Sequence, residues 1–389
     1  MEIEQLLIPP LYENQLDMQS FARMLESPTQ SYKFYWLEAI VTLLPEKDEM
    51  SFEEVIFEMF WEAWYTVTQY HLHLGPTILG QSENLIEHAV HVIEHDPDVK
   101  LPMSREQFME LLVKNRNQIK PDVEGLIKNV PYRLLSSFMK EIGGDDRIWD
   151  QKKRLIAYLA ILNRSIHLPY VIIDGRGASK KIRVNPAWKQ VMLDNYMLVK
   201  SWIQMKKVRF LQDRNPGVPG IVYKLEDENN RVRRLEKVRD LWHTYEVVSE
   251  RQVHDLYSGN HIQENRFSVD HFVPWSYVNS DELWNLVPMD RGNNSSKGNR
   301  LPDWDRFFPR LVSTHYDLYD VIFSNESARK KFEACRTHNL NSLWAIELLY
   351  VPGNSKERFG NMLEHNMKPI YEAAMLQGYT IWRGLTNEE

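Results

Sequence analysis

Two adjacent polar residues, Asp270 and His271, interrupt an apolar run in the segment "SVDHFVPWS", residues 268–276. Either the pair only marks the turn that follows a strand, or it performs chemistry. A carboxylate is a hard ligand suited to Mg²⁺ or Mn²⁺, and a neutral histidine can take a proton from water near neutral pH. The pair is therefore compatible with metal-assisted hydrolysis. This chemistry would also need further metal ligands and a cation near the pair in the fold.

Further polar residues follow within thirty positions and extend this chemistry. Asn285 begins "NLVPM", and Asn294 and Lys297 stand three residues apart in "NNSSKG". An amide oxygen is another hard metal ligand, and an ammonium group can neutralise charge that builds on a phosphate. The alternative is that these residues only cap and pair locally, since Asn294 is a good capping type. Capping does not explain the combination, which indicates phosphodiester hydrolysis.

The elements that must position these residues form a β-β-α unit. Two short apolar runs, "RFSVDHFV" and "LWNLVPM", flank a polar connection, and small polar residues suited to a helix start come next. Asp270 and His271 then end the first strand, and Asn294 lies on the helix. Neighbouring residues of a regular strand point to opposite faces, so the backbone must depart from regularity before Pro274 if both serve one site.

The patterns D-H-x-x-P-x-S, N-L-V-P and N-x-x-K-G closely resemble the HNH motif of the ββα-metal nucleases, over about residues 254–302. The resemblance implies DNA cleavage with Mg²⁺ or Mn²⁺, in which His271 activates a water that attacks a metal-bound phosphate. It implies that Asp270 and Asn294 bind the metal; Asn293 is a rival that the spacing disfavours. The remaining matches are Asn285, which would brace the loop holding the histidine, and Lys297, at a common basic position grouped with the catalytic residues.

The segment "LYSGNHI", residues 256–262, resembles the knuckle that often precedes the motif in this family. In many members the knuckle carries zinc-binding cysteines, whereas the only cysteine of this chain is Cys335. We therefore expect no structural zinc, and packing must hold the hairpin. No catalytic pattern surrounds Cys335, which predicts a buried structural thiol.

Charge is distributed unevenly along the 389 residues and suggests three regions. The net charge of −7 hides a block at 150–250 with a charge of about +9 between two acidic blocks. We expect an α+β, predominantly helical chain: an acidic helical domain at 1–149, a basic mixed helix-and-strand region at 150–250, and the nuclease domain with C-terminal helices at 251–389. Within the middle region, 187–214 is predicted to be one long helix.

The basic block could be a set of solvated helix faces, but its place before the nuclease motif favours a grip on the DNA backbone. Such contacts would be independent of sequence and sensitive to salt. Eight residues are predicted to make them: Lys206, Lys207, Arg209, Arg231, Arg233, Arg234, Lys237 and Arg239.

Other polar clusters are interpreted as structural. His88, His91 and His95 share one face of a predicted helix whose opposite face is apolar, so solvent exposure is favoured over a metal site. The turn "DGRGASKK", 174–181, lacks the spacing of a phosphate-binding P-loop. An acidic N-terminal segment predicts no signal peptide, and no apolar stretch predicts a membrane span, so we expect a cytoplasmic protein.

The sequence thus predicts a metal-dependent HNH endonuclease acting on DNA, which we expect to be double-stranded, with 1–149 available for a protein partner or self-association. By analogy with the family, it could serve a bacterial defence or restriction system. Two alternatives stay open: a catalytically inactive DNA-binding or adaptor protein on the same scaffold, and an RNA nuclease.

Overall fold

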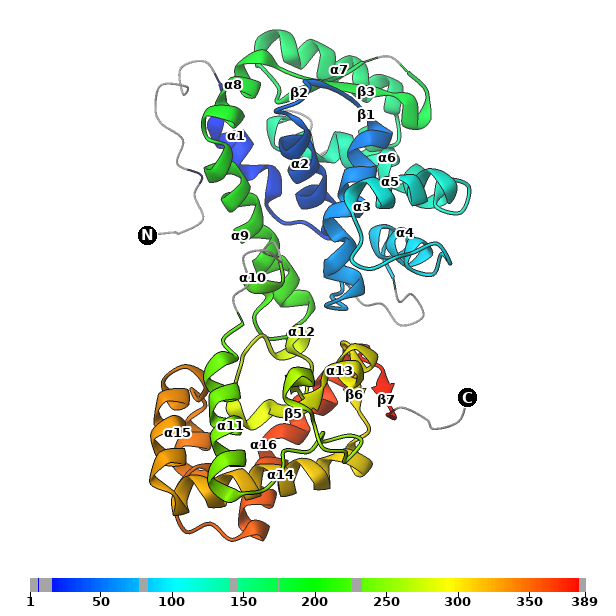
Figure 1. Cartoon of the computed structure of the whole chain (residues 1–389). Helices are drawn as coiled ribbons and strands as arrows, with labels where there is room; N and C mark the ends of the chain where they lie inside the picture. Colours follow the sequence, from blue (N-terminus) through cyan, green and yellow to red (C-terminus); the bar gives the residue numbers. More distant parts are fainter. Residues whose placement is uncertain are drawn as a thin grey trace. The chain divides into compact units, whose positions relative to one another are not determined.

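The computed structural model describes residues 6, 16–76, 83–139, 146–173, 175–225 and 233–384 (Figure 1). The chain divides into two compact units, Met1–Pro216 (unit 1) and Gly217–Glu389 (unit 2). Both are mostly helical with small sheets, as the predicted fold class requires. The division falls within 150–250, so the first part of this basic segment belongs to unit 1 and the rest to unit 2.

Unit 1 is built mainly from helices, several of which begin at polar caps. At the start of α3, Ser51 accepts a hydrogen bond from the Glu54 amide, and the Glu54 side chain accepts one from the Ser51 amide, so the two residues form a capping box. The helices are α1 (Met18–Ala22), α2 (Tyr32–Leu43), α3 (Phe52–Thr68), α4 (Leu85–Glu94), α5 (Arg105–Lys114), α6 (Lys120–Arg133), α7 (Lys152–Ser165), α8 (Pro186–Asp194) and α9 (Tyr196–Arg214).

A three-stranded antiparallel sheet completes unit 1. Strands β2 (Tyr170–Ile173) and β3 (Lys181–Val184) pair across the glycine-containing turn, and β1 (Glu49–Ser51) pairs with the other edge of β3. The buried residues of α2 and α3, among them Trp36, form the core of this unit together with those of α9.

The long helix predicted at 187–214 is two helices, because the chain breaks at Asn195. The Asn195 backbone leaves helical geometry, with φ −116° and ψ 31°, and its side chain donates to the Val191 carbonyl at 2.9 Å. Asparagine competes with the backbone for hydrogen bonds in this way, which favours an interruption. In α4 the predicted faces are confirmed: Ile86, Ala89, Val90 and Ile93 are buried, and His88 is exposed.

Unit 2 consists of helices around a small hairpin. Its helices are α10 (Ile221–Lys224), α11 (Glu236–Ser249), α12 (Trp275–Val278), α13 (Arg291–Lys297), α14 (Trp304–Ser324), α15 (Glu326–Asn339) and α16 (Lys356–Leu376). A π-helical segment spans Ala345–Leu349. Strands β4 (Phe267–His271) and β5 (Leu286–Asp290) are antiparallel, and β6 (Leu301–Pro302) runs parallel to β7 (Ile381–Trp382).

Aromatic packing fixes the end of β4 in unit 2. Phe272, which follows the strand directly, is fully buried and lies 6.1 Å from the ring of Trp304. Trp304 in turn stacks on Phe308, one helical turn along α14, with ring centroids 4.1 Å apart. Burial of such large rings contributes strongly to stability, so the residues before Phe272 are held against a rigid layer. Among the described residues no helix combines the length and apolar character needed to cross a membrane.

Candidate active site

The predicted β-β-α unit is present, formed by β4, β5 and α13. In the hairpin register Asp270 lies opposite Val287 and His271 opposite Leu286. All five residues of β4 are buried, so the polar side chains at its end must find partners inside the unit. Alternation along the strand places Ser268 and Asp270 on one face and His271 on the other.

Helix α13 covers the face that carries Ser268 and Asp270. Lys297 Nζ lies 2.9 Å from Asp270 Oδ2, and Asn294 Nδ2 donates to Ser268 Oγ at 2.9 Å. Asn294 and Lys297 lie on one face of the helix, three residues apart. Their partners, Ser268 and Asp270, lie on one face of the strand, two residues apart. The helix ends at Gly298, whose φ of 54° and ψ of −135° are open to glycine and strained for other residues, which explains the glycine of N-x-x-K-G.

Lys297 is completely buried, and its ammonium group is occupied within the unit. Besides the contact with Asp270, it donates to the main-chain carbonyl of His271 at 2.8 Å. A buried charge needs such partners, since leaving it unpaired costs several kcal/mol. The geometry therefore places Lys297 between α13 and the end of β4, where it holds both residues of the Asp-His pair.

His271 points away from α13 and pairs with a residue that we did not predict. Its Nε2 lies 2.9 Å from Asp281 Oδ1, and both side chains are nearly buried. Asp281 Oδ2 accepts from the Arg234 amide at 2.7 Å, and Asn339 Nδ2 donates to the Asp281 carbonyl at 2.8 Å. The carboxylate is thus fixed by segments far apart in the sequence.

The environment of Asp281 keeps its side chain ionised. Burial alone raises its pKa, but hydrogen bonds from His271 and from the Arg234 amide outweigh burial, so the pKa lies below the usual 3.8. An ionised carboxylate at Nε2 accepts the ring proton there and leaves Nδ1 with a free electron pair. The only sequence signal for Asp281 was an acidic residue in the polar connection between the two strands.

Asn285 lies just before β5 and is fully buried. Its Oδ1 accepts from the Val273 amide at 2.8 Å, and its Nδ2 donates to the Val273 carbonyl at 2.9 Å. Two hydrogen bonds to one residue fix the chain two positions after His271. The resemblance implies that Asn285 braces the loop that holds the histidine, and both of its hydrogen bonds are to this loop.

The knuckle before the hairpin is joined to it through Asp255, a carboxylate with 1% exposure. One oxygen, Oδ1, accepts from the amides of Tyr257 and Ser258 and from the Ser258 hydroxyl, at 2.7–3.0 Å. The other, Oδ2, accepts from the Asp290 amide at 2.7 Å and from Asn293 Nδ2 at 3.1 Å. Asp255 therefore links the knuckle, the end of β5 and the start of α13, and Asn293 is engaged here.

The α13 face offers two oxygens that suit a divalent cation. Asp270 Oδ1 and Asn294 Oδ1 accept no hydrogen bond from any described residue, although the other polar atom of each side chain is engaged. Carboxylate and amide oxygens are ligands that Mg²⁺ and Mn²⁺ accept, and Mg²⁺ usually keeps several waters. No group of three or more His, Cys, Asp or Glu side chains suited to a metal occurs in the part of the chain that the structure describes. Asp270 and Asn294 thus fit a cation that is otherwise held by water and substrate.

The residues predicted to grip DNA are divided between the two units. Lys206, Lys207 and Arg209 belong to α9 in unit 1, whereas the described members near the nuclease motif belong to unit 2: Arg233, Arg234, Lys237 and Arg239. Those four are exposed, and Arg233 lies over the ring of Trp275 at 5.0 Å. Arg231 lies outside the described residues.

Lys207 is a correction to the predicted DNA grip. It is 2% exposed, its ammonium group pairs with Glu38, and it lies 4.6 Å from the ring centroid of Tyr35. An ammonium group enclosed in this way cannot reach a phosphate in solution. Lys206 is half-buried and Arg209 is exposed, so the prediction for these two neighbours is unaffected by this burial.

Comparison with known proteins locates the similarity in the same unit. A family model described as HNH endonuclease matches residues 255–303, from the carboxylate of the knuckle to the start of α14. Comparisons with curated proteins and with solved structures give no match.

Proposed function

Residues 255–303 form an HNH endonuclease domain, and we propose that the protein uses it to hydrolyse phosphodiester bonds of DNA in the presence of Mg²⁺ or Mn²⁺. One observation carries this proposal: Asp270 and Asn294 each leave one oxygen unengaged, and the residue that follows Asp270, His271, is oriented by a nearly buried carboxylate. A binding protein would need neither feature.

His271 is the general base of the proposed reaction. Because Nε2 is directed at Asp281, Nδ1 is the nitrogen that takes a proton from the attacking water. Asp281 keeps the ring in this tautomer and stabilises the imidazolium that forms, and Asn285 fixes the backbone behind it. A positioned base contributes about 10²- to 10⁴-fold to a rate.

Asp270 and Asn294 would hold the cation, which when bound polarises the phosphate and neutralises the charge that develops on it. Lys297 holds Asp270 in place, and its burial favours this positioning role over direct contact with the phosphate. Exposed Arg233, Arg234, Lys237 and Arg239 are proposed to attract the DNA backbone. Service in a bacterial defence or restriction system rests on the resemblance of the motif alone.

The test is cleavage of supercoiled plasmid by the full chain with Mg²⁺, with Mn²⁺ and with EDTA, alongside His271→Ala. We expect nicked or linear product that requires both the cation and His271. His338→Ala serves as the matched control, because His338 is an exposed histidine of α15. Intact plasmid under every cation, combined with retarded migration of plasmid in a gel, would identify a binding protein and overturn the proposal. RNA incubated in parallel distinguishes an RNA nuclease, which would show product from RNA only.

A further inference from the structure

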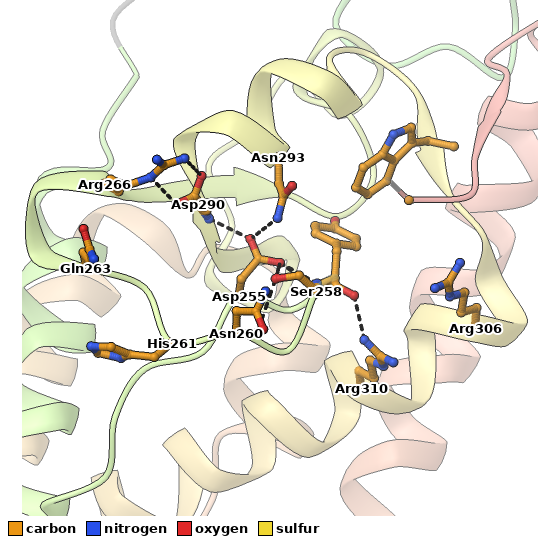
Figure 2. Close-up of a pocket in the computed structure, with 13 residues that line it drawn as sticks. Asp255, Ser258, Asn260, His261, Gln263, Arg266, Asp290, Asn293, Arg306 and Arg310 are labelled. Atoms are coloured by element: carbon orange, nitrogen blue, oxygen red, sulfur yellow. Dashed lines mark hydrogen bonds and ion pairs between the residues drawn. The ribbon is translucent and has the colours of Figure 1, made fainter. Parts of the chain in front are cut away.

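A polar cavity of about 550 Å³ opens in unit 2 beside the hairpin. Figure 2 shows its residues projecting from the knuckle, from the ends of the hairpin and from α14. The side chains that matter here are Ser258, Asn260, His261, Arg266, Arg306 and Arg310. None of them belongs to the proposed catalytic group.

The two carboxylates at this cavity are already engaged. Asp290 receives both Nε and Nη2 of Arg266, at 2.6 and 2.7 Å, which neutralises that arginine. Asp255 is buried and saturated by the hydrogen bonds that tie the knuckle to the hairpin. The acidic groups therefore leave the remaining arginines without an anion.

Arg306 and Arg310 are those arginines. They stand one turn apart on α14, are exposed, and both line the cavity. Arg306 Nη1 donates to the Arg383 carbonyl at 2.5 Å, and Arg310 Nη1 donates to the Tyr257 carbonyl at 2.6 Å. Neither forms an ion pair with any described residue, and each keeps further guanidinium N–H groups for an anion.

The cavity is joined to the proposed active site through Tyr257 and Asn293, which both line it. The Tyr257 hydroxyl lies 3.5 Å from Asp270 Oδ2, and Asn293 directly precedes Asn294 on α13. The cavity and the residues proposed to bind the cation therefore share these two neighbours, Tyr257 and Asn293.

We propose that Arg306 and Arg310 bind a backbone phosphate of the nucleic-acid strand, away from the bond that is cut. The inference rests on the proposed nuclease function and names a substrate contact for it. Guanidinium groups match the geometry of phosphate oxygens, and the side-chain amide of Asn260 offers a further hydrogen bond.

A strand phosphate fits this cavity better than a free nucleotide, because the two large rings of the lining offer a base no open face. Tyr257 and Trp382 are 4% and 3% exposed and pack against each other with ring centroids 5.0 Å apart. A base would have only the imidazole ring of His261, which is exposed, to stack on. A phosphate needs only the cations and polar groups that are present.

The experiment measures binding of a fluorescent DNA duplex to the full chain in EDTA, as a function of salt, for the wild type and for Arg306→Gln/Arg310→Gln. We expect about a 10-fold weaker affinity and a shallower dependence of log K on log salt, by roughly one unit for each phosphate that the variant no longer neutralises. Arg329→Gln removes an exposed arginine of α15 and is the matched control, with affinity unchanged. Arg306→Lys, which keeps the charge, should retain most of the binding, and circular dichroism confirms the fold.

Unchanged duplex affinity and salt slope in the double variant would overturn the proposal. So would arginine-dependent binding of ADP or inorganic phosphate that leaves duplex affinity untouched, because the cavity would then serve a free anion. Plasmid cleavage with Mg²⁺ is measured separately. The proposal is supported if the double variant binds DNA more weakly but cleaves at the wild-type rate when DNA is saturating. Absence of cleavage by the wild type contradicts the nuclease function without altering the binding result.

Discussion

Each unit of the molecule contains a buried lysine paired with a carboxylate, and the two pairs have different surroundings. In unit 1 Lys207 pairs with Glu38, and in unit 2 Lys297 pairs with Asp270. Both lysines come from a helix and are enclosed almost completely. By burial and charge alone the two pairs could not be told apart.

The two pairs differ in whether the remaining side-chain oxygens accept a hydrogen bond. In unit 1 the second oxygen of Glu38 accepts from Gln204 at 2.6 Å, so the carboxylate is fully engaged. In unit 2 Asp270 Oδ1 and Asn294 Oδ1 accept from no described residue, and His271 directly follows Asp270 in the chain. A buried ion pair alone therefore does not indicate a site, and we expect the open oxygens to separate the unit 2 pair from the unit 1 pair in function.

The largest effect is expected from His271→Ala. Loss of the base should reduce plasmid cleavage by about 10²- to 10⁴-fold, because no other described side chain takes the proton from water in this arrangement. Single-turnover cleavage at saturating enzyme measures the change, with His338→Ala as control. A variant that retains more than about a tenth of the rate would remove His271 from the proposed role.

The second prediction substitutes the lysine of each pair separately and compares the two losses of stability and activity. Lys207→Met and Lys297→Met should each lower the free energy of unfolding by about 3–5 kcal/mol, because each leaves a buried carboxylate without its partner. Urea titration measures both losses. Only Lys297→Met should also reduce cleavage, measured at a temperature where the variant is folded.

The unit 1 pair has its own control in Glu38→Leu/Lys207→Met, which removes both charges and should recover most of the stability. Normal cleavage by Lys297→Met, once folding is confirmed, would place the two pairs in the same structural class and contradict the comparison.

A smaller effect is expected from Asp281→Asn, which has no counterpart in unit 1. The amide cannot stabilise the imidazolium, so the rate should fall by about 10- to 100-fold, a range typical of groups that orient a site. Asp320→Asn, an exposed carboxylate of α14, is the control. If the rate is unchanged, Asp281 serves the fold alone.

The smallest effect concerns stability and pH. The pKa of Asp281 is lowered in the folded protein, so its ionised form favours folding above the ordinary value near 3.8, and the contribution is lost as pH falls through the folded pKa. Thermal unfolding should therefore show the wild type above Asp281→Asn at about pH 6, with the gap closing as the pH falls below the ordinary value of 3.8. A gap that widens in acid would reverse the sign and exclude the lowered pKa.

Local patterns in the sequence sufficed for the hairpin and its helix. The alternation in β4, the glycine after Lys297 and the caps of α13 act over a few residues, so they can be interpreted without the fold. Asp281 and Asp255 could not be assigned in this way, because their roles depend on partners brought together by folding, such as Asn339 for one and Asn293 for the other.

Lys207 shows where a signal was present and overlooked. Val199, Ile203 and Leu211 are buried residues of α9, and Lys207 falls on the same line, four positions from both Ile203 and Leu211. The helical period therefore placed this lysine toward the core, although its basic neighbours suggested a surface. Its buried partner Glu38, far away in the sequence, makes the position tolerable.

The way in which Asp255 fastens the knuckle has a consequence for redox chemistry. Where thiolates hold a zinc ion, oxidants can strip the metal and disorder the loop. Here the fastening uses only carboxylate oxygens, amides and a hydroxyl, and the single thiol, Cys335, is buried in α15 with a pKa raised to about 12 by burial. A thiol-blocking reagent should therefore leave the hairpin folded.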